Sequence, residues 1–476
     1  MRQRVKKSSQ GISNVHEKVL MISLSKLEKL IFYLLIFCIP FQTRLILAKW
    51  PVLRSFSEGG SLSPEVGFNE WTSAFLYLTD LFILGLLVLW LMRIVTKQSH
   101  FGFQKRDFAL FGFLAISALS ITQSSFAEIS WYQFAKLTEF VTLYFYVRAN
   151  RDKVFNIFGI CWAIFLSGVF QSVIAIAQYG HQASLGLRWL GESSLHLPGE
   201  GIASFYSAGQ LVLRPYGTLP HPNVLAVFLL VALTACAILY FLNKTNLAFY
   251  SDRHTVQGSK KDFFLLIGFA TMLYAFFLTY SRTVIAIPVA MLALLLIITW
   301  FNKNWRKQLL QYKKQLVVLT SISVAVVGLF LALNYQEVIA RVFFFKDDEA
   351  VTMRLFYNRV AGQDFLDRTW LGSGIGTFVS NMMVTLKHAP ANIFQPVHNI
   401  YLLILAETGL LGLAFWGLFI KSTIRSYISK YDLGDIKNII LPIILASFLL
   451  IGLFDHFFWT LQQGHLLLWL VLALMA

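Results

Sequence analysis

His398, Arg214 and Arg282 are the residues of this chain best suited to chemistry. His398 lies where a long polar segment ends and an apolar run begins. An imidazole whose pKa is near ambient pH can accept a proton from a hydroxyl group. An arginine side chain binds phosphate oxygens through paired hydrogen bonds and keeps its charge. These residue types predict a site where a hydroxyl is activated beside a bound phosphate group.

Each of these residues also has a purely structural explanation. Arg282 lies between two apolar runs with almost no loop, and burial near lipid is costly unless an anion compensates the charge. Its side chain is also long enough to reach lipid headgroups or an acidic neighbour. His398 is also placed to cap a helix. His221 and His456, which follows Asp455, are weaker candidates for the same site, and helix-end or packing roles are favoured for them.

The elements that must position these side chains are membrane helices. The chain has 476 residues, of which 57% are hydrophobic and 13% charged, and its mean hydropathy is +0.64. Apolar runs of roughly 18 to 25 residues recur along the chain, each able to cross a hydrocarbon core of about 30 Å. The sequence predicts an all-α polytopic membrane protein with about twelve transmembrane helices. They cover residues 29–47, 72–93, 107–123, 130–147, 154–179, 223–242, 262–281, 283–301, 316–334, 399–420, 438–455 and 461–476.

Lysine and arginine are concentrated in every second segment between these helices, as in cytoplasmic loops. Residues 1–28 are therefore predicted to be a basic cytoplasmic tail, followed by an uncleaved signal anchor, with both termini in the cytoplasm. The net charge of +16 has the same origin. Because the charge is spread over short loops, nucleic acid is excluded as a partner. The three cysteines lie in apolar runs and show no metal-ligand spacing.

Two predicted extra-cytoplasmic segments are long, covering about residues 180–222 and 335–398, and the second includes an amphipathic stretch from Val351 to Phe365. Most other connections are short, which indicates a function at the outer face. Residues 29–476 are predicted to form one integral membrane domain. This topology brings the candidate side chains to the same extra-cytoplasmic face although they are far apart in sequence: Arg214, His221, Arg282, His398, Asp455 and His456.

Some charged residues fall well inside predicted helices, and structural pairing is favoured for Lys136, Glu139, Asp80 and Glu407 over substrate contact. Lys136 and Glu139 are one helical turn apart, so an intramembrane ion pair is the simplest explanation. Asp80 and Glu407 are further embedded acids. The glycines from Gly372 to Gly376 lack the lysine and hydroxyl residue that end a Walker loop, and they predict a flexible turn or a close backbone approach to a ligand.

Several motifs together resemble the O-antigen ligase and polymerase family of bacterial envelope glycosyltransferases, most clearly over a core of about residues 214–412. The most specific is His398-Asn399 followed, after nine residues, by Gly409-x-x-Gly412. The ending Asp455-His456 with Trp459 also looks like that of ligase-like members. The other motifs are Arg214-x-x-Gly217 leading to His221-Pro222-Asn223, Ser281-Arg282, Arg354, and Gly372-x-Gly374-x-Gly376.

The resemblance implies a GT-C-like fold in the bacterial cytoplasmic (inner) membrane, with an extra-cytoplasmic active site. Family members transfer a glycan en bloc from an undecaprenyl-pyrophosphate-linked donor to an acceptor hydroxyl, with no cofactor or metal expected. The acceptor is a lipid core, a glycan or a protein, and membrane lipid surrounds the site. Carried over to this chain, Arg214 and Arg282 hold the pyrophosphate, Arg354 is a less secure donor contact, and His398 activates the acceptor.

Three functions stay open. A ligase attaches a finished glycan to a different acceptor, whereas a polymerase of the same family extends a repeat chain with the same charged groups. The motif after His398 and the ending at Asp455 favour the ligase. A lipid-linked glycan flippase or transporter is the alternative from another class, but it favours polar groups through the helix interiors and inverted repeats. Here the strongest groups gather at one face, and no repeat is apparent.

Overall fold

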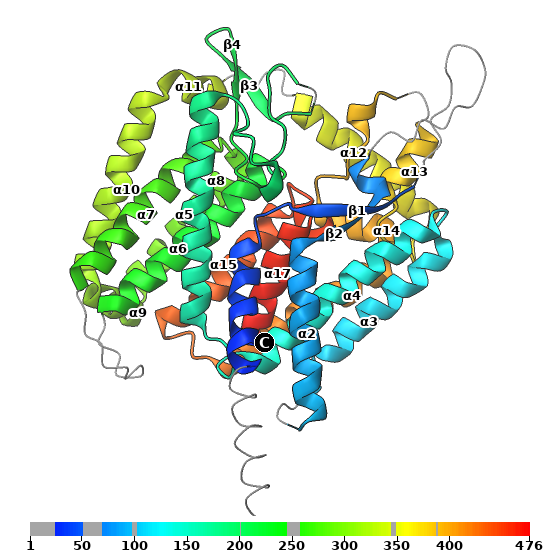
Figure 1. Ribbon diagram of the computed structural model, residues 1–476, viewed down its shortest axis with the longest axis horizontal. Helices are drawn as coiled ribbons and strands as arrows, with labels where there is room; N and C mark the ends of the chain where they lie inside the picture. Colours follow the sequence, from blue (N-terminus) through cyan, green and yellow to red (C-terminus); the bar gives the residue numbers. More distant parts are fainter. Residues whose placement is uncertain are drawn as a thin grey trace, which may run out of the picture.

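The computed structural model describes residues 24–50, 69–97, 102–199, 201–244, 258–343, 349–386 and 389–476. Of the predicted basic tail, residues 1–23 lie outside the described residues, and the described part of the first helix covers residues 24–38. Figure 1 shows two groups of helices, with that first helix and α17 (Gln462–Met475) between them. One group contains α5 (Ile157–His181), α6 (Pro222–Lys244), α7 (Gly258–Leu278) and α10 (Lys313–Leu333). The other contains α2 (Leu78–Val95), α3 (Asp107–Ser120) and α4 (Ala127–Asn150).

Every apolar run predicted as a membrane helix contains a helix. Besides the helices named above, these are α8 (Arg282–Phe301), α14 (Ile400–Lys430) and α15 (Ile440–Ile451). Within the described residues, seven helices are long and apolar enough to cross a membrane, and three further apolar helices are shorter. The protein is thus a mostly helical, integral membrane protein, as the hydropathy predicts.

The first two predicted helices include residues that are not helical in the structure. Residues 44–49 and 73–77 instead form strands β1 (Arg44–Lys49) and β2 (Ser73–Tyr77), which pair antiparallel with Arg44 opposite Tyr77. The prediction is therefore wrong for residues 39–47 and 72–77. The reason is that a short apolar run fits a strand as well as a helix, and pairing with a distant segment decides between them.

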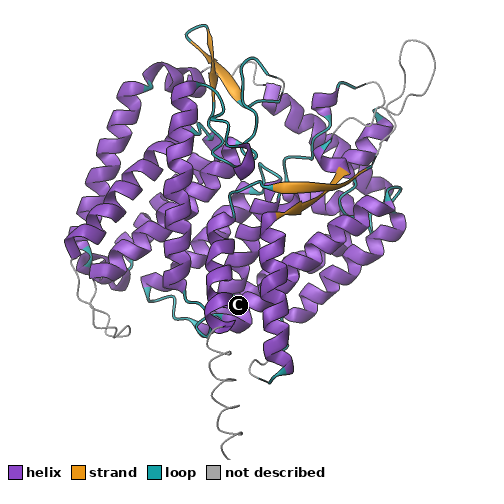
Figure 2. Ribbon diagram, viewed as in Figure 1, coloured by secondary structure: helices purple, strands orange, loops and turns teal. Residues whose placement is uncertain are grey.

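Both long segments lie at one end of the molecule (Figures 1 and 2). The first carries β3 (Ser204–Ser207) and β4 (Gln210–Leu213), and the second is largely helical. Its helices are α11 (Tyr335–Phe343), α12 (Glu349–Asp367) and α13 (Phe378–Thr385), so the amphipathic stretch is a helix. The opposite end holds α9 (Lys303–Gln311) and the C-terminus.

Helix α14 is broken at Gly409, whose backbone angles are φ 69° and ψ −172°. Residues 369–374, which precede α14 in the chain, form hydrogen bonds with backbone groups on both sides of this break. The Gly374 N–H donates to the Glu407 carbonyl (3.0 Å), and the Leu410 N–H donates to the Thr369 carbonyl (2.8 Å). A backbone group without water must find such a partner inside the protein. The break is therefore a fixed joint between two segments.

The glycine-rich stretch is explained by the same joint. Gly372 has φ +69°, and a Cβ there would lie 2.4 Å from the carbonyl carbon of Glu407. A Cβ at Gly409 would lie 2.3 Å from the backbone of Trp370. The close approach of the glycine backbone is thus made to α14 and not to a ligand, as the sequence had led us to expect, and the turn is fixed by hydrogen bonds.

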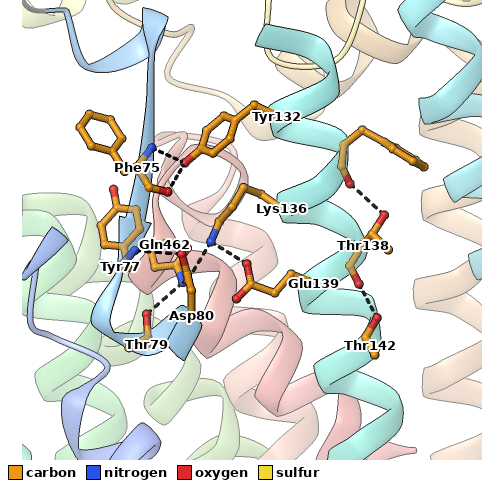
Figure 3. A network of polar contacts seen from close by, with 11 residues as sticks. Phe75, Tyr77, Thr79, Asp80, Tyr132, Lys136, Thr138, Glu139, Thr142 and Gln462 are labelled. Carbon is orange, nitrogen blue, oxygen red and sulfur yellow. Dashed lines mark hydrogen bonds and ion pairs between the residues drawn. The ribbon is translucent and has the colours of Figure 1, made fainter. Parts of the chain in front are cut away.

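An ion network joins α2, α4 and α17 (Figure 3). The Lys136 ammonium lies 2.7 Å from an Asp80 oxygen and 2.6 Å from a Glu139 oxygen. Gln462 of α17 donates to Asp80 over 2.5 Å. The predicted pairing of Lys136 with Glu139 is confirmed, and Asp80 belongs to the same network. Glu407 accepts a hydrogen bond from the Trp459 indole (2.8 Å).

We expect Gly409→Ala to destabilise the protein strongly. Its backbone conformation costs a residue with a side chain about 1–3 kcal/mol, and the overlap with Trp370 adds to this. Gly417→Ala is the matched control, because Gly417 is in the same helix and a Cβ there meets nothing within 4 Å. That control should be neutral or stabilising by about 1 kcal/mol or less. Thermal unfolding of the purified variants measures both, and equal midpoints would refute the account of the joint.

Candidate functional site

The first turn of α14 fixes the position of His398. Asn399 is the N-cap, and its side-chain oxygen accepts from the N–H groups of Tyr401 (2.9 Å) and Leu402 (3.1 Å). The Ile400 N–H donates to the Gly452 carbonyl (2.8 Å), which ties this turn to the segment leading to Asp455. Asn399, a candidate from the sequence, therefore acts as a helix cap beside His398.

The His398 ring is held between two other rings. Tyr357 of α12 stacks on it with a centroid distance of 5.8 Å, and His456 meets it edge-on at 4.9 Å. Within the described residues, its buried Nδ1 makes no hydrogen bond of ordinary geometry. The Pro396 carbonyl nevertheless lies near enough to favour the protonated ring. The imidazole is oriented by packing rather than by a strong polar partner.

Asn223 links the histidine side of the site to the arginine side. Its amide nitrogen donates to Asp455 (2.8 Å). Its amide oxygen accepts from the Arg214 guanidinium and from the Ser281 hydroxyl, both over 2.8 Å. Asp455 also accepts from the His456 backbone N–H over 2.8 Å. Segments far apart in sequence thus meet at one place, as the topology predicts.

Arg214 is the centre of a cluster of arginines. It is only 6% exposed, and its Nε donates to the Thr279 carbonyl over 2.8 Å. Burial, followed by the neighbouring charges of Arg341 and Arg282, lowers the pKa of Arg214. A guanidinium nevertheless stays charged at neutral pH. Arg214, Arg282 and Arg341 therefore place three positive charges together, and Asp455 is an acid near Arg214. Such a cluster attracts an anion.

Arg341, on α11, is the site residue that the sequence did not single out. Its guanidinium lies 5.6 Å from the Phe205 ring centroid of β3, and its charge acts on Arg214. No local motif marks it, because only the fold brings α11 beside β3 and the segment after β4 that carries Arg214. Arg354, a candidate from the sequence, lies on α12 near enough for its charge to oppose protonation of His398.

The three histidines of the site are held neutral. Burial lowers the pKa of His221 to about 3 and that of His456 to about 3. His221 accepts from the Asn223 N–H at Nδ1 (3.1 Å), which supports a structural role at the start of α6. Burial also lowers the pKa of His398, while Asp455 opposes this shift. Although burial would raise the pKa of Asp455, the surrounding histidines and Asn223 lower it below its usual range.

The arrangement can accept a proton and can neutralise an anion. A neutral His398 is available to take a proton from a hydroxyl. Charged arginines on the other side of Asp455 can stabilise negative charge on a leaving group. Among the described residues, no group of three or more His, Cys, Asp or Glu side chains could hold a metal ion.

The model of a protein family described as O-antigen ligase matches residues 267–417. These residues belong to the O-antigen ligase family. Its members are glycosyltransferase-like enzymes of envelope glycan assembly. The matched ligase segment contains Arg282, Arg341, Arg354 and His398, whereas Arg214 joins the site from outside it. No curated protein matches the chain.

We expect inorganic pyrophosphate to raise the unfolding temperature of the purified protein, because it binds the arginine cluster. Arg341→Gln and Arg282→Gln should each weaken this binding about 10- to 100-fold, since a charged hydrogen bond contributes roughly 1.5–3 kcal/mol. Arg188→Gln is the control, because Arg188 is exposed in the first long segment. Equal affinities in all four proteins would contradict an anion site at the cluster.

Proposed function

We propose that this protein is an O-antigen ligase-like glycosyltransferase. It moves a glycan en bloc from undecaprenyl pyrophosphate to an acceptor hydroxyl at the extra-cytoplasmic face, without a metal ion. The single observation that carries the proposal is that His398 lies near Asp455, which Asn223 joins by hydrogen bonds to the buried Arg214 and its arginine neighbours. The family of residues 267–417 supports the same class of reaction.

The proposed step is a direct displacement at the first carbon of the donor glycan. The acceptor oxygen forms a bond to this carbon as its proton passes to the His398 imidazole. The bond from the carbon to the pyrophosphate oxygen breaks, and the electron pair leaves with undecaprenyl pyrophosphate. Arg214, Arg282 and Arg341 stabilise the charge that develops there, and Arg354 is placed as a further donor contact.

Asp455 assists by its charge. Once His398 holds the proton, the ring is an imidazolium in a buried setting, which costs free energy without a nearby anion. The Asp455 carboxylate raises the pKa of His398 against the effect of burial. It is itself fixed by Asn223 and by the His456 N–H.

The proposed setting is the bacterial cytoplasmic (inner) membrane, with both termini in the cytoplasm. We propose that all twelve predicted helices cross it and that the fold is GT-C-like. The strongly basic short helix α9 at the end opposite the site supports this orientation.

A reconstituted assay distinguishes the ligase from its alternatives. With a lipid-pyrophosphate glycan donor, transfer onto an acceptor that is not the repeat unit supports a ligase. A ladder of repeat lengths would show a polymerase of the same family. Movement of the donor across the membrane without release of undecaprenyl pyrophosphate would overturn both transferase functions in favour of a flippase.

We expect His398→Ala to lower glycan transfer by about 100- to 10,000-fold, the usual contribution of a general base. His196→Ala is the control, because His196 is exposed in the first long segment. Both are measured in the reconstituted assay and by complementation of a strain without its surface-glycan ligase. Full transfer by His398→Ala at normal expression would exclude the general-base role.

The pH dependence gives a second test. The base must be neutral, and burial lowers the pKa of His398 from 6.5. The rate should therefore hold its plateau as pH falls to 6.5 and decline below that value. Asp455→Asn should move this decline to lower pH, because the carboxylate favours the protonated ring. A decline that Asp455→Asn leaves unmoved, or moves to higher pH, would contradict the assignment.

A further inference from the structure

A groove runs along α14 toward the C-terminal end of this helix. It is open on one side and holds about 520 Å³. Its lining comes from α14, apart from Leu449 of α15, and is apolar except for Lys421, Arg425 and the hydroxyl of Tyr401. We call this space the α14 groove. On a membrane-spanning helix its occupant must be apolar over most of its length, because a polar group there loses water without gaining a partner.

One end of the α14 groove is closed on the side of the candidate functional site. The Tyr401 hydroxyl donates to the Leu449 carbonyl over 2.7 Å, and the Tyr401 ring meets Trp416 edge-on with a centroid distance of 5.8 Å. The hydroxyl is thus already bonded inside the protein, and Trp416 is only 5% exposed. This end therefore presents a fixed apolar wall.

The other end of the α14 groove is basic. Gly417, Lys421 and Arg425 follow one another at intervals of four, so they share one stripe of the helix. A neighbouring stripe with the same spacing, from Trp416 to Ile428, is apolar. Lys421 and Arg425 are exposed, and neither forms an ion pair with another described residue. Two cations thus border an apolar groove without a compensating acid.

This basic end lies away from the candidate functional site. Helix α14 ends at Lys430, and the segment after it contacts α9, where Asn304 and Gln308 donate to the Gly434 carbonyl over 3.1 and 2.7 Å. Figure 1 shows α9 at the end opposite the site. Lys421 precedes Lys430 by about 13 Å of helix, a depth from which a long basic side chain reaches the headgroups.

Gly417 leaves room for a chain between the two ends. A Cβ at this position would meet nothing within 4 Å. An acyl chain can therefore lie against the backbone of α14 between Trp416 and Lys421. Close contact along such a surface gains dispersion energy at each carbon atom. The groove thus offers a long apolar contact that leads to two positive charges.

The combination of these features identifies the occupant as an anionic phospholipid. A soluble phosphate would meet the two cations but would leave the apolar wall uncovered. A phospholipid without net charge would cover the wall but would leave the cations uncompensated, which is costly near lipid. Basic side chains that only reach toward headgroups need no groove beside them. A lipid with a negatively charged headgroup satisfies the wall and the cations together.

We propose that the α14 groove binds one anionic phospholipid, with an acyl chain along Gly417 and its phosphate at Lys421 and Arg425. With the proposed orientation of the protein, this lipid belongs to the cytoplasmic leaflet. The groove and its ligand do not depend on glycan transfer, because they lie at the other end of the helix that begins after His398.

Native mass spectrometry of the full chain in detergent tests the proposal. The probes are dioleoyl phosphatidylglycerol, dioleoyl phosphatidylcholine and glycerol phosphate. One phosphatidylglycerol should bind more tightly than phosphatidylcholine, and excess glycerol phosphate should not displace it. Lys421→Gln combined with Arg425→Gln should weaken its binding about 30-fold, from about five-fold for each positive charge. Arg306→Gln combined with Lys314→Gln is the matched control, because it removes exposed charges of both kinds outside the groove.

A second variant tests the apolar part of the α14 groove. Gly417→Phe should weaken the binding of both phospholipids, because the ring takes the space of the acyl chain. Gly328→Phe is its control, since a Cβ at Gly328 on α10 also meets nothing within 4 Å. Thermal unfolding in the same detergent without added lipid shows that each variant is folded.

Four results would overturn the proposal. Equal binding of both phospholipids that the charge variants leave unchanged would indicate ordinary surrounding lipid. Equal losses in the two pairs of charge variants would indicate diffuse attraction to the basic surface. Displacement by glycerol phosphate would indicate a soluble anion as the ligand. A dimer that Gly417→Phe dissociates, with no phosphatidylglycerol bound, would assign the groove to a second copy of the chain.

Discussion

The break in α14 is the constraint on which the setting of the proposed base depends. A helix interrupted inside a membrane protein leaves backbone groups that no water can reach, so another segment must pair with them. Here residues 369–374 do so, on both sides of Gly409. His398 precedes the first half of this helix, and Glu407 is the second residue before the break. One joint made of glycine and backbone hydrogen bonds therefore sets the helix that begins directly after the proposed base.

The charges of the molecule are divided between two kinds of surroundings. Lys136 is enclosed by Asp80 and Glu139, an arrangement that satisfies its charge inside the protein. Arg214 instead has Arg282 and Arg341 near it, and their charges disfavour its own. A buried ion pair is weak evidence for stability and needs no ligand. Around the buried Arg214 the like charges of Arg282 and Arg341 gather instead, which favours the binding of an anion. This contrast distinguishes a structural set of charges from the proposed binding site.

The sequence predicts the parts of this molecule that depend on local pattern. Apolar length places a helix in every predicted range, and the spacing of Lys136 and Glu139 predicts their ion pair. The predicted topology also brings the segments of Arg214, Arg282 and His398 to one face, where Asn223 joins Arg214 to Asp455. The hairpin of β1 and β2 was missed because pairing between distant segments decides strand against helix. Arg341 was missed for the same kind of reason, since only the packing of α11 near β3 brings it to Arg214. For the glycines, a flexible turn or a close approach to a ligand was predicted, whereas their partner is a broken helix, which is a property of the whole fold.

The amide of Asn223 has one donor end and one acceptor end, and its neighbours occupy both. Its nitrogen is committed to Asp455 and its oxygen to Arg214 and Ser281, so neither a flip nor a shift preserves the bonds. The side chain is therefore a spacer of fixed length and fixed polarity between the two ends of the reaction path. A change of charge near Arg214 alters the polarisation of the Asn223 amide. The altered amide then changes the strength of the hydrogen bond that its nitrogen donates to Asp455. Binding of one substrate can thus change the electrostatic environment where the other substrate reacts, without any movement of the backbone.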